Sequence, residues 1–88
     1  MEFEWDQRKA STNLRKHAVD FADAATVLYD DRAITLSDDE VDEQRYITIG
    51  TDGLGRVLVV IYTLRGERVR IISARLSNRR ERATYMEI

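Results

Sequence analysis

The stretch Arg56-Val57-Leu58-Val59-Val60-Ile61-Tyr62-Thr63-Leu64-Arg65 decides the fold of this 88-residue chain. Its apolar side chains fall on both faces of an extended strand, which is typical of a central strand that is covered on each side. Two further strands, Gln44–Gly50 and Arg68–Arg75, flank it along the chain. The short Gly53-Leu54-Gly55 and Arg65-Gly66-Glu67 connections predict hairpins, so the three strands form an antiparallel meander with helices, or a partner, against both faces.

The remaining elements complete an α+β fold. In chain order we predict a strand Glu2–Trp5, a helix Gln7–His17 capped by Asp6, a second helix from the cap Asp20 to Tyr29, a strand Ala33–Leu36, an acidic loop Ser37–Glu43, and a final helix that starts at Ser77 or Asn78 with Asn78 and Glu81 as a capping box. The predicted class is therefore an antiparallel β-sheet meander with two N-terminal helices and a C-terminal helix. Residues 1–88 form one domain, since a chain of this length has room for a single core.

Helical spacing predicts which side chains face the sheet. In the first helix, Ala10 and Leu14 form a narrow apolar stripe, while Lys9, Asn13 and Lys16 share another face that is available to a ligand or partner. In the last helix, we expect the contacts with the sheet to be made by Ala83, Met86 and Leu76.

Composition excludes several classes of protein. The chain has no cysteine and one histidine, His17, which excludes thiol nucleophiles, thiolate metal sites and a multi-histidine zinc site, so any metal would need carboxylates alone. We expect no metal and no cofactor. No apolar run is long enough to span a bilayer, and the acidic N-terminus does not resemble a secretion signal. We predict a cytoplasmic protein with no membrane segment.

Charge is segregated along the chain although the net charge is only -2. Residues 20–43 hold one basic and nine acidic side chains, a net charge of -8, whereas residues 44–82 hold nine arginines and three acidic side chains, a net charge of +6. Because guanidinium groups bind planar oxyanions and stay charged, the second segment predicts contacts with phosphate or with an acidic partner. The alternative is that these arginines are ordinary solvated surface residues.

Several strings, in their order along the chain, resemble the BrnT toxin family. They are Phe3-Glu4-Trp5-Asp6, Lys9 to Asn13 to Lys16-His17, Phe21, Arg45 before Ile47-Thr48-Ile49-Gly50, Gly55-Arg56, Ile71-Ile72-Ser73-Ala74-Arg75, and Arg79 to Glu81-Arg82 with Tyr85. The resemblance implies a RelE-like fold and a ribonuclease toxin of a type II toxin–antitoxin system, inhibited by a BrnA-type antitoxin. Ala18 departs from the family, which has glycine there, and this implies a turn that does not require a left-handed residue.

Cleavage of RNA by its own 2'-hydroxyl needs a base, an acid and cations around the phosphorus. Arg75, Arg79 and Arg82 are candidates for the cations, since the end of one strand and the start of the last helix would bring them to one phosphate. His17 is the candidate for proton transfer because histidine titrates near neutral pH, and the alternative role is a helix cap. Two carboxylates are further candidates for the base, with structural alternatives: Glu81 in the capping box and Glu43 in a pair with Arg45.

Other side chains are candidates for binding. They are Lys9, Asn13, Lys16, Arg45 and Arg56; the sequence does not decide to which side the strand arginines point, although Arg68 and Arg70 share one pleat face. Trp5 and Tyr85 could stack on bases, and for Trp5 the alternative is a place in the core.

Three functions remain open. The first is a metal-independent endoribonuclease that binds RNA and is neutralised by its antitoxin, with a homodimer inside a larger toxin–antitoxin complex as one arrangement. The second is a family member with little or no nuclease activity that serves as a protein-binding module for the antitoxin. The third is a nucleic-acid-binding regulator that acts only through its complex.

Overall fold

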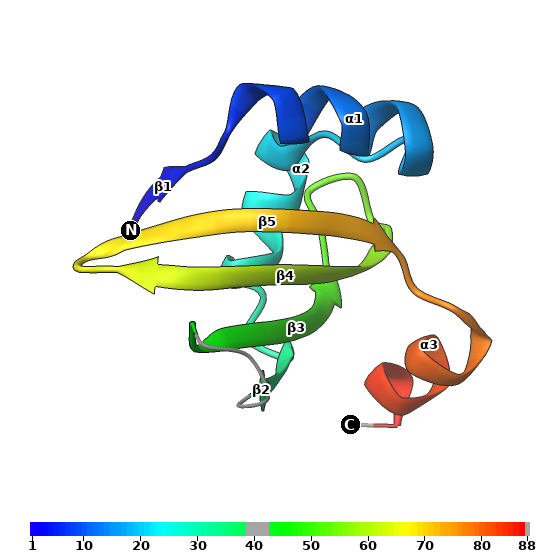
Figure 1. The fold of residues 1–88 in the computed structure, drawn as a ribbon. Helices are drawn as coiled ribbons and strands as arrows, with labels where there is room; N and C mark the ends of the chain where they lie inside the picture. Colours follow the sequence, from blue (N-terminus) through cyan, green and yellow to red (C-terminus); the bar gives the residue numbers. More distant parts are fainter. Residues whose placement is uncertain (39–42, 88) are drawn as a thin grey trace.

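A computed structural model describes residues 1–38 and 43–87 of the chain. Its elements are β1 (Glu2–Glu4), α1 (Gln7–His17), α2 (Phe21–Thr26), the 3-10 helix η1 (Val27–Tyr29), β2 (Ile34–Asp38), β3 (Arg45–Thr51), β4 (Val57–Arg65), β5 (Arg68–Leu76) and α3 (Arg79–Met86). They form one five-stranded sheet with helices on its two sides (Figure 1), which confirms the α+β class. Residues 39–42 of the predicted acidic loop lie outside the described residues. No helix of the described part is both long and apolar enough to cross a membrane.

The sheet has the strand order β1-β5-β4-β3-β2. The predicted meander of β3, β4 and β5 is present, and β2 adds to it in antiparallel orientation. The sheet is nevertheless mixed, because β1 pairs in parallel with the start of β5, where Glu2 lies opposite Arg68 and Phe3 opposite Val69. This corrects the prediction of a purely antiparallel sheet. A parallel pair between the two ends of a chain leaves no local sequence pattern from which it could have been predicted.

Hydrogen bonds of Asp6 and Ala18 cap the two ends of helix α1. The Asp6 carboxylate accepts hydrogen bonds from the amides of Arg8 and Lys9, at 2.9 and 3.1 Å, which confirms the predicted N-cap. At the other end Ala18 has φ 57° and ψ 32°, and its amide donates to the Leu14 carbonyl at 2.9 Å. The expectation that this turn would not require a left-handed residue is therefore wrong. The helix closes with a left-handed C-cap although the residue there is alanine and not glycine.

Helix α2 is shorter than predicted. Asp20 caps it by accepting from the Ala22 amide at 2.8 Å, as expected, but the α-helix ends at Thr26 and continues as η1. The Asp30 amide donates to the Val27 carbonyl at 3.0 Å, which closes the tighter 3-10 turn. This turn brings the Asp30 side chain to the end of β3.

The main core lies between the sheet and α2. In β4, Leu58 and Val60 are fully buried on this side, together with Val19, Phe21 and Val27. Val57 and Val59 point to the opposite face, where they form a smaller cluster with Ile49 and Tyr85 of α3. The prediction that the central strand is covered on both faces is confirmed.

Helix α3 is attached by one buried side chain. Its capping box is present as predicted: the Asn78 side chain accepts from the Glu81 amide and the Glu81 carboxylate accepts from the Asn78 amide, both at 2.8 Å. Only Tyr85 is buried within this helix, whereas Met86 is 63% exposed and Ala83 and Leu76 are also exposed. The expected contacts of these three residues are therefore wrong, because α3 meets the sheet through Tyr85 in its last turn and through the bond of Glu81 to Arg75 in its first turn.

Candidate nucleic-acid interface

All five arginines within the strands lie on one face of the sheet. The pairing registers place Arg45 of β3, Arg65 of β4, and Arg68, Arg70 and Arg75 of β5 on the face opposite to α2. We call this set the arginine face. It carries α3 at one end, and apolar residues such as Ile47 and Ile61 lie between its arginines. The predicted shared face of Arg68 and Arg70 is confirmed, and the structure settles the direction that the sequence left open.

Most of these arginines contact a carboxylate of the same chain. Arg70 Nη1 lies 2.7 Å from Glu4 Oε2, and Arg68 Nε lies 3.4 Å from Glu2 Oε2. Arg65 Nε lies 3.0 Å from Glu43 Oε1, so the prediction that Glu43 pairs with Arg45 is wrong. The reason is the register: Arg45 lies next to β2 at the start of β3, whereas Arg65 at the end of β4 reaches the segment that precedes β3. The Arg45 Nε is buried without a partner among the described residues.

Arg75 is joined to the first turn of α3. Its Nη1 and Nη2 donate to Oε1 and Oε2 of Glu81, both at 2.8 Å, in a bidentate pair. This hydrogen bonding raises the pKa of Arg75 and lowers the pKa of the Glu81 carboxyl. Glu81 is therefore an ionised partner of Arg75 as well as the capping-box residue that the sequence predicts.

The arginines of α3 are free of ion pairs within the described part of the chain. Arg79, Arg80 and Arg82 are exposed, and none lies within ion-pair distance of a described carboxylate. The Arg75–Glu81 pair brings the end of β5 against the helix turn that carries Arg79. Of the three arginines predicted to meet one phosphate, Arg79 and Arg82 thus have unpaired guanidinium groups, whereas Arg75 already holds a carboxylate.

A second cationic feature borders the arginine face. A hollow of about 310 Å³ lies between α1 and β5, and we call it the α1 groove. Its lining residues are Arg8, Lys9, Thr12, Asn13, Lys16, His17, Ile72 and Ser73. The structure thus brings together Lys9, Asn13, Lys16 and His17, which were predicted from helical spacing and from chemistry. The structure adds Arg8 to the groove. Arg8 lies on the same helix face as Thr12 and Lys16, and their spacing of four residues could have been read from the sequence.

None of the described residues that line the α1 groove is acidic. Ser73 on its floor lies on β5 between Arg70 and Arg75, so the groove opens beside the arginine face. His17 is the last residue of α1 and is exposed. The groove and the arginine face meet at Ser73, and together they are the candidate surface for a chain of phosphates.

Asn13 joins α1 to the sheet. Its side chain is buried; Nδ2 donates to the carbonyls of Ala74 and Val19, at 2.8 and 3.0 Å, and Oδ1 accepts from the Ala74 amide at 3.1 Å. Because β1 covers only Arg68–Arg70 of the β5 edge, the Asn13 amide satisfies the next stretch of this edge as a neighbouring strand would. Leu14 of the expected apolar stripe is 48% exposed, so that part of the prediction is wrong: the polar residue anchors the helix.

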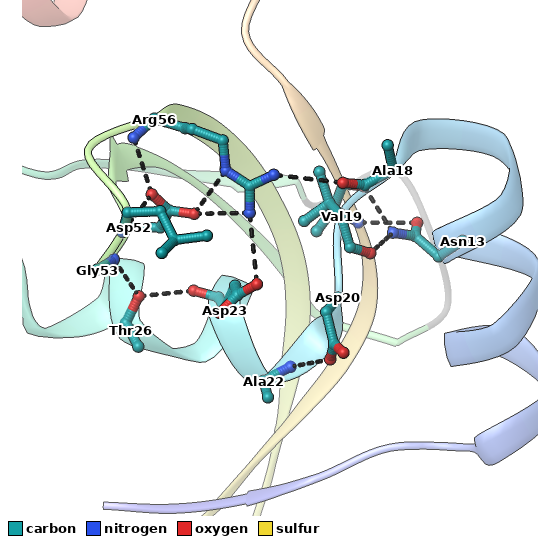
Figure 2. Close-up of polar contacts among 12 residues, drawn as sticks. Asn13, Ala18, Val19, Asp20, Ala22, Asp23, Thr26, Asp52, Gly53 and Arg56 are labelled. Atoms are coloured by element: carbon teal, nitrogen blue, oxygen red, sulfur yellow. Dashed lines mark hydrogen bonds and ion pairs between the residues drawn. The ribbon is translucent and has the colours of Figure 1, made fainter.

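Arg56 connects the β3–β4 hairpin to the N-terminal helices. Figure 2 shows its guanidinium between two carboxylates and a backbone oxygen: Nε donates to Asp52 at 2.9 Å, Nη1 to the Ala18 carbonyl at 3.2 Å, and Nη2 lies 3.5 Å from Asp23. The Asp52 side chain is fully buried. This proposed binding residue therefore lies in a structural network, away from the arginine face.

The two aromatic candidates for stacking on bases are packed in the fold. Trp5 lies against the main core with its ring edge-on to Phe21, at a centroid distance of 6.0 Å, as the alternative expected. Tyr85 is buried, and its hydroxyl donates to Asp30 Oδ2 at 2.6 Å and accepts from Thr51 Oγ1 at 2.8 Å. The Asp30 contact raises the pKa of Tyr85. The structure therefore gives Tyr85 a role in the fold, and its buried ring is not placed to stack on a base.

A larger hollow, of about 440 Å³, lies on the opposite side of the sheet. Its walls include Tyr46, Tyr62, Leu28 and Leu64, and its lining contains Asp30 but no lysine or arginine. An apolar hollow with a carboxylate does not suit a polyanion, so we place the candidate interface on the smaller α1 groove and the arginine face.

Comparison with known proteins identifies a family and a similar structure. Residues 5–81 match a family model described as the ribonuclease toxin BrnT of type II toxin–antitoxin systems. The crystal structure of the Brucella abortus ribonuclease toxin BrnT is similar to this chain, with 28% sequence identity and a TM-score of 0.68 over 90% of this chain and 99% of that chain. A search of curated proteins finds no match.

Proposed function

The chain belongs to the BrnT family of ribonuclease toxins of type II toxin–antitoxin systems, and from this premise we propose that it is a metal-independent endoribonuclease of RelE-like fold acting in the cytoplasm. In this proposal residues 1–88 act as one domain, RNA lies across the arginine face and the α1 groove, and a BrnA-type antitoxin blocks that surface.

One observation carries the proposal: the strand arginines share one face, and this face adjoins a groove lined by three cationic side chains and a histidine without any carboxylate. Lysine and arginine side chains in a row bind successive phosphates of single-stranded RNA, independently of its sequence. The chain is acidic overall, so this local arrangement is what would attract a polyanion.

The chemistry follows from the groove. With the RNA backbone beside α1, His17 accepts the proton of a 2'-hydroxyl, the 2'-oxygen forms a bond to the adjacent phosphorus, and the bond from phosphorus to the 5'-oxygen breaks. The leaving oxygen takes a proton from water, and the products are a 2',3'-cyclic phosphate and a 5'-hydroxyl. Lys9 and Lys16 hold the reacting phosphate. Arg79 and Arg82 contact the neighbouring phosphates of the RNA, and their positive charge offsets the negative charge that develops at the reacting phosphorus.

The antitoxin would neutralise the same surface. The arginines of this face already pair with carboxylates of the chain itself. We therefore expect acidic side chains of the antitoxin to contact Arg79 and Arg82 of the adjoining helix α3, whose guanidinium groups are unpaired among the described residues. Bound antitoxin and bound RNA would then exclude each other. A homodimer of the toxin inside the complex is compatible with this arrangement and is part of the proposal.

The test is cleavage of single-stranded RNA by purified chain in the presence of EDTA. We expect cleavage to persist in EDTA, and His17→Gln to lower the rate by about 10²-fold or more, because it removes the proton acceptor. Lys16→Gln should also lower the rate, because it removes a phosphate contact. Arg15→Gln is the matched control: Arg15 is exposed on α1 next to Lys16 but does not line the groove, so this variant should cleave as the wild type does.

Intact RNA at high concentrations of correctly folded protein would exclude the nuclease. Equal losses in the Lys16 and Arg15 variants would exclude the phosphate contact assigned to Lys16, because they would show a general effect of charge. The second candidate, a binding module for the antitoxin without activity, is favoured by the carboxylates that already contact four of the five strand arginines. It predicts tight antitoxin binding with no cleavage by any variant.

A further inference from the structure

Two of the ion pairs on the arginine face are partly shielded from solvent. The Glu4 and Arg70 side chains are 29% and 30% exposed, and Glu81 and Arg75 are 22% and 41% exposed, whereas Glu2 in the pair with Arg68 is 73% exposed. Exposed pairs contribute little and break readily, but charge-assisted bonds at 2.7 and 2.8 Å in a half-buried setting persist. Glu4 and Glu81 therefore stay in place while a ligand approaches.

These carboxylates lie at the two ends of the surface that adjoins the α1 groove. Along β5, Arg70 and Arg75 lie on either side of Ser73, which lines the groove. A phosphate that contacts either arginine comes within a few ångströms of its carboxylate, and the two charges act on it in opposite directions.

The backbone geometry at neither site depends on the negative charge. Glu4 is positioned by the backbone pairing of β1 with β5, in which it lies opposite Arg70, and its carboxylate takes no part in that ladder. Glu81 serves the capping box with an oxygen acceptor, a role that the neutral amide of glutamine fills equally well. Removal of either charge therefore leaves these backbone contacts in place.

We propose that Glu4 and Glu81 are internal competitors of RNA phosphate, which hold Arg70 and Arg75 neutralised and so keep the affinity for RNA low. This inference rests on the proposed function and concerns the same surface. In this inference the two carboxylates control how strongly RNA binds, because the RNA phosphates must compete with them for the arginines.

The test uses Glu4→Gln and Glu81→Gln in the full chain with a fluorescent 2'-O-methyl oligouridylate, which cannot be cleaved, followed by anisotropy at low salt. We expect each variant to bind about fivefold more tightly, since one opposing charge near the phosphate is removed. The slope of log Kd against log salt should steepen by about 0.7 for each additional phosphate that a freed arginine neutralises. Asp31→Asn is the matched control, because Asp31 is exposed in the turn before β2 and makes no ion pair with a described residue.

A combined variant separates competition from a general effect of charge. Glu4 contacts both Arg68, at 3.9 Å, and Arg70, at 2.7 Å, so Glu4→Gln should not increase the affinity of a chain that carries Arg68→Gln and Arg70→Gln. The inference is overturned if Glu4→Gln binds with unchanged or lower affinity while the wild type binds, if the increase persists in the chain without Arg68 and Arg70, or if Asp31→Asn gives the same increase. Failure of every chain to bind the oligonucleotide overturns the proposed function together with this inference, whereas the other outcomes leave that function intact.

Discussion

Ala18 holds the turn between α1 and α2 with a φ of 57°, a conformation that costs an alanine about 1 kcal/mol and a glycine almost nothing. Ala18→Gly also increases the entropy of the unfolded chain, which offsets part of the gain. We expect this variant to raise the free energy of unfolding by about 0.5 kcal/mol, seen as a higher urea midpoint at an unchanged m-value.

The same substitution at an exposed helical position should change the free energy of unfolding in the opposite direction. Ala83 lies within α3, where glycine costs about 0.5–1 kcal/mol relative to alanine, so Ala83→Gly should lower the urea midpoint. If both variants are destabilised alike, the left-handed turn at Ala18 does not carry the strain that its φ indicates.

Residue roles were predictable from the sequence where the partner is close along the chain. Asp6, Asp20 and the pair Asn78–Glu81 bond amides two or three residues away, and each was predicted correctly. Asn13 and Tyr85 bond groups 61 and 55 residues away, and the same residue types would also suit an exposed binding site. Their structural roles depend on how the elements pack, which no local pattern encodes.

At the scale of elements, α3 depends on a group of bonds around Asp30. Burial raises the pKa of Asp30, but hydrogen bonds from the Thr51 amide, the Tyr85 hydroxyl and the Arg32 amide outweigh it and leave the pKa lowered. A lowered pKa means that the ionised carboxylate stabilises the fold above its unfolded pKa of about 3.9, and that this contribution is lost as the pH falls through the folded value. Tyr85, with a raised pKa, contributes fully below about pH 10 and loses its contribution as the pH rises through its folded pKa.

Tyr85→Phe should therefore lower the free energy of unfolding by about 1–2 kcal/mol between pH 5 and 9, because it removes a hydrogen bond to a carboxylate. The difference between wild type and variant should shrink as the pH falls through the lowered pKa of Asp30, and as the pH rises through the raised pKa of Tyr85. Thermal unfolding of both chains across this pH range is the measurement. A difference that does not change with pH would show that the hydroxyl bonds a neutral group.

The strands of the meander were predicted within a residue or two of their observed bounds, because alternation of apolar side chains and glycine turns are local signals. Helix α2 was predicted too long, because the residues of the following 3-10 turn cannot be distinguished from an α-helix in a short sequence window. The parallel pairing of β1 with β5 was missed, and with it the contact of Glu4 with Arg70 that the pairing creates. What the sequence leaves undecided at this scale is which elements become neighbours.

For the whole molecule, the segregation of charge along the chain becomes a segregation in space. The basic segment supplies every strand arginine, and alternation along paired strands places them on one face, while α1 adds a basic groove at its border. The sequence showed that arginines were concentrated between residues 44 and 82. Only the register of β3, β4 and β5 shows that they point the same way.

This arrangement predicts how RNA binding responds to salt. If about three cationic side chains contact phosphates of a single strand, log affinity should fall with log salt at a slope near -2 although the chain is acidic. A chain that carries both Arg79→Gln and Lys16→Gln should show a slope near -0.7, because two of these cations are removed, whereas Arg15→Gln should keep the wild-type slope. Anisotropy of the uncleavable oligonucleotide at about 25 to 200 mM salt measures all three. A flat response of the wild type would mean that the basic surface serves a protein partner, since counterion release on binding RNA requires phosphate contacts.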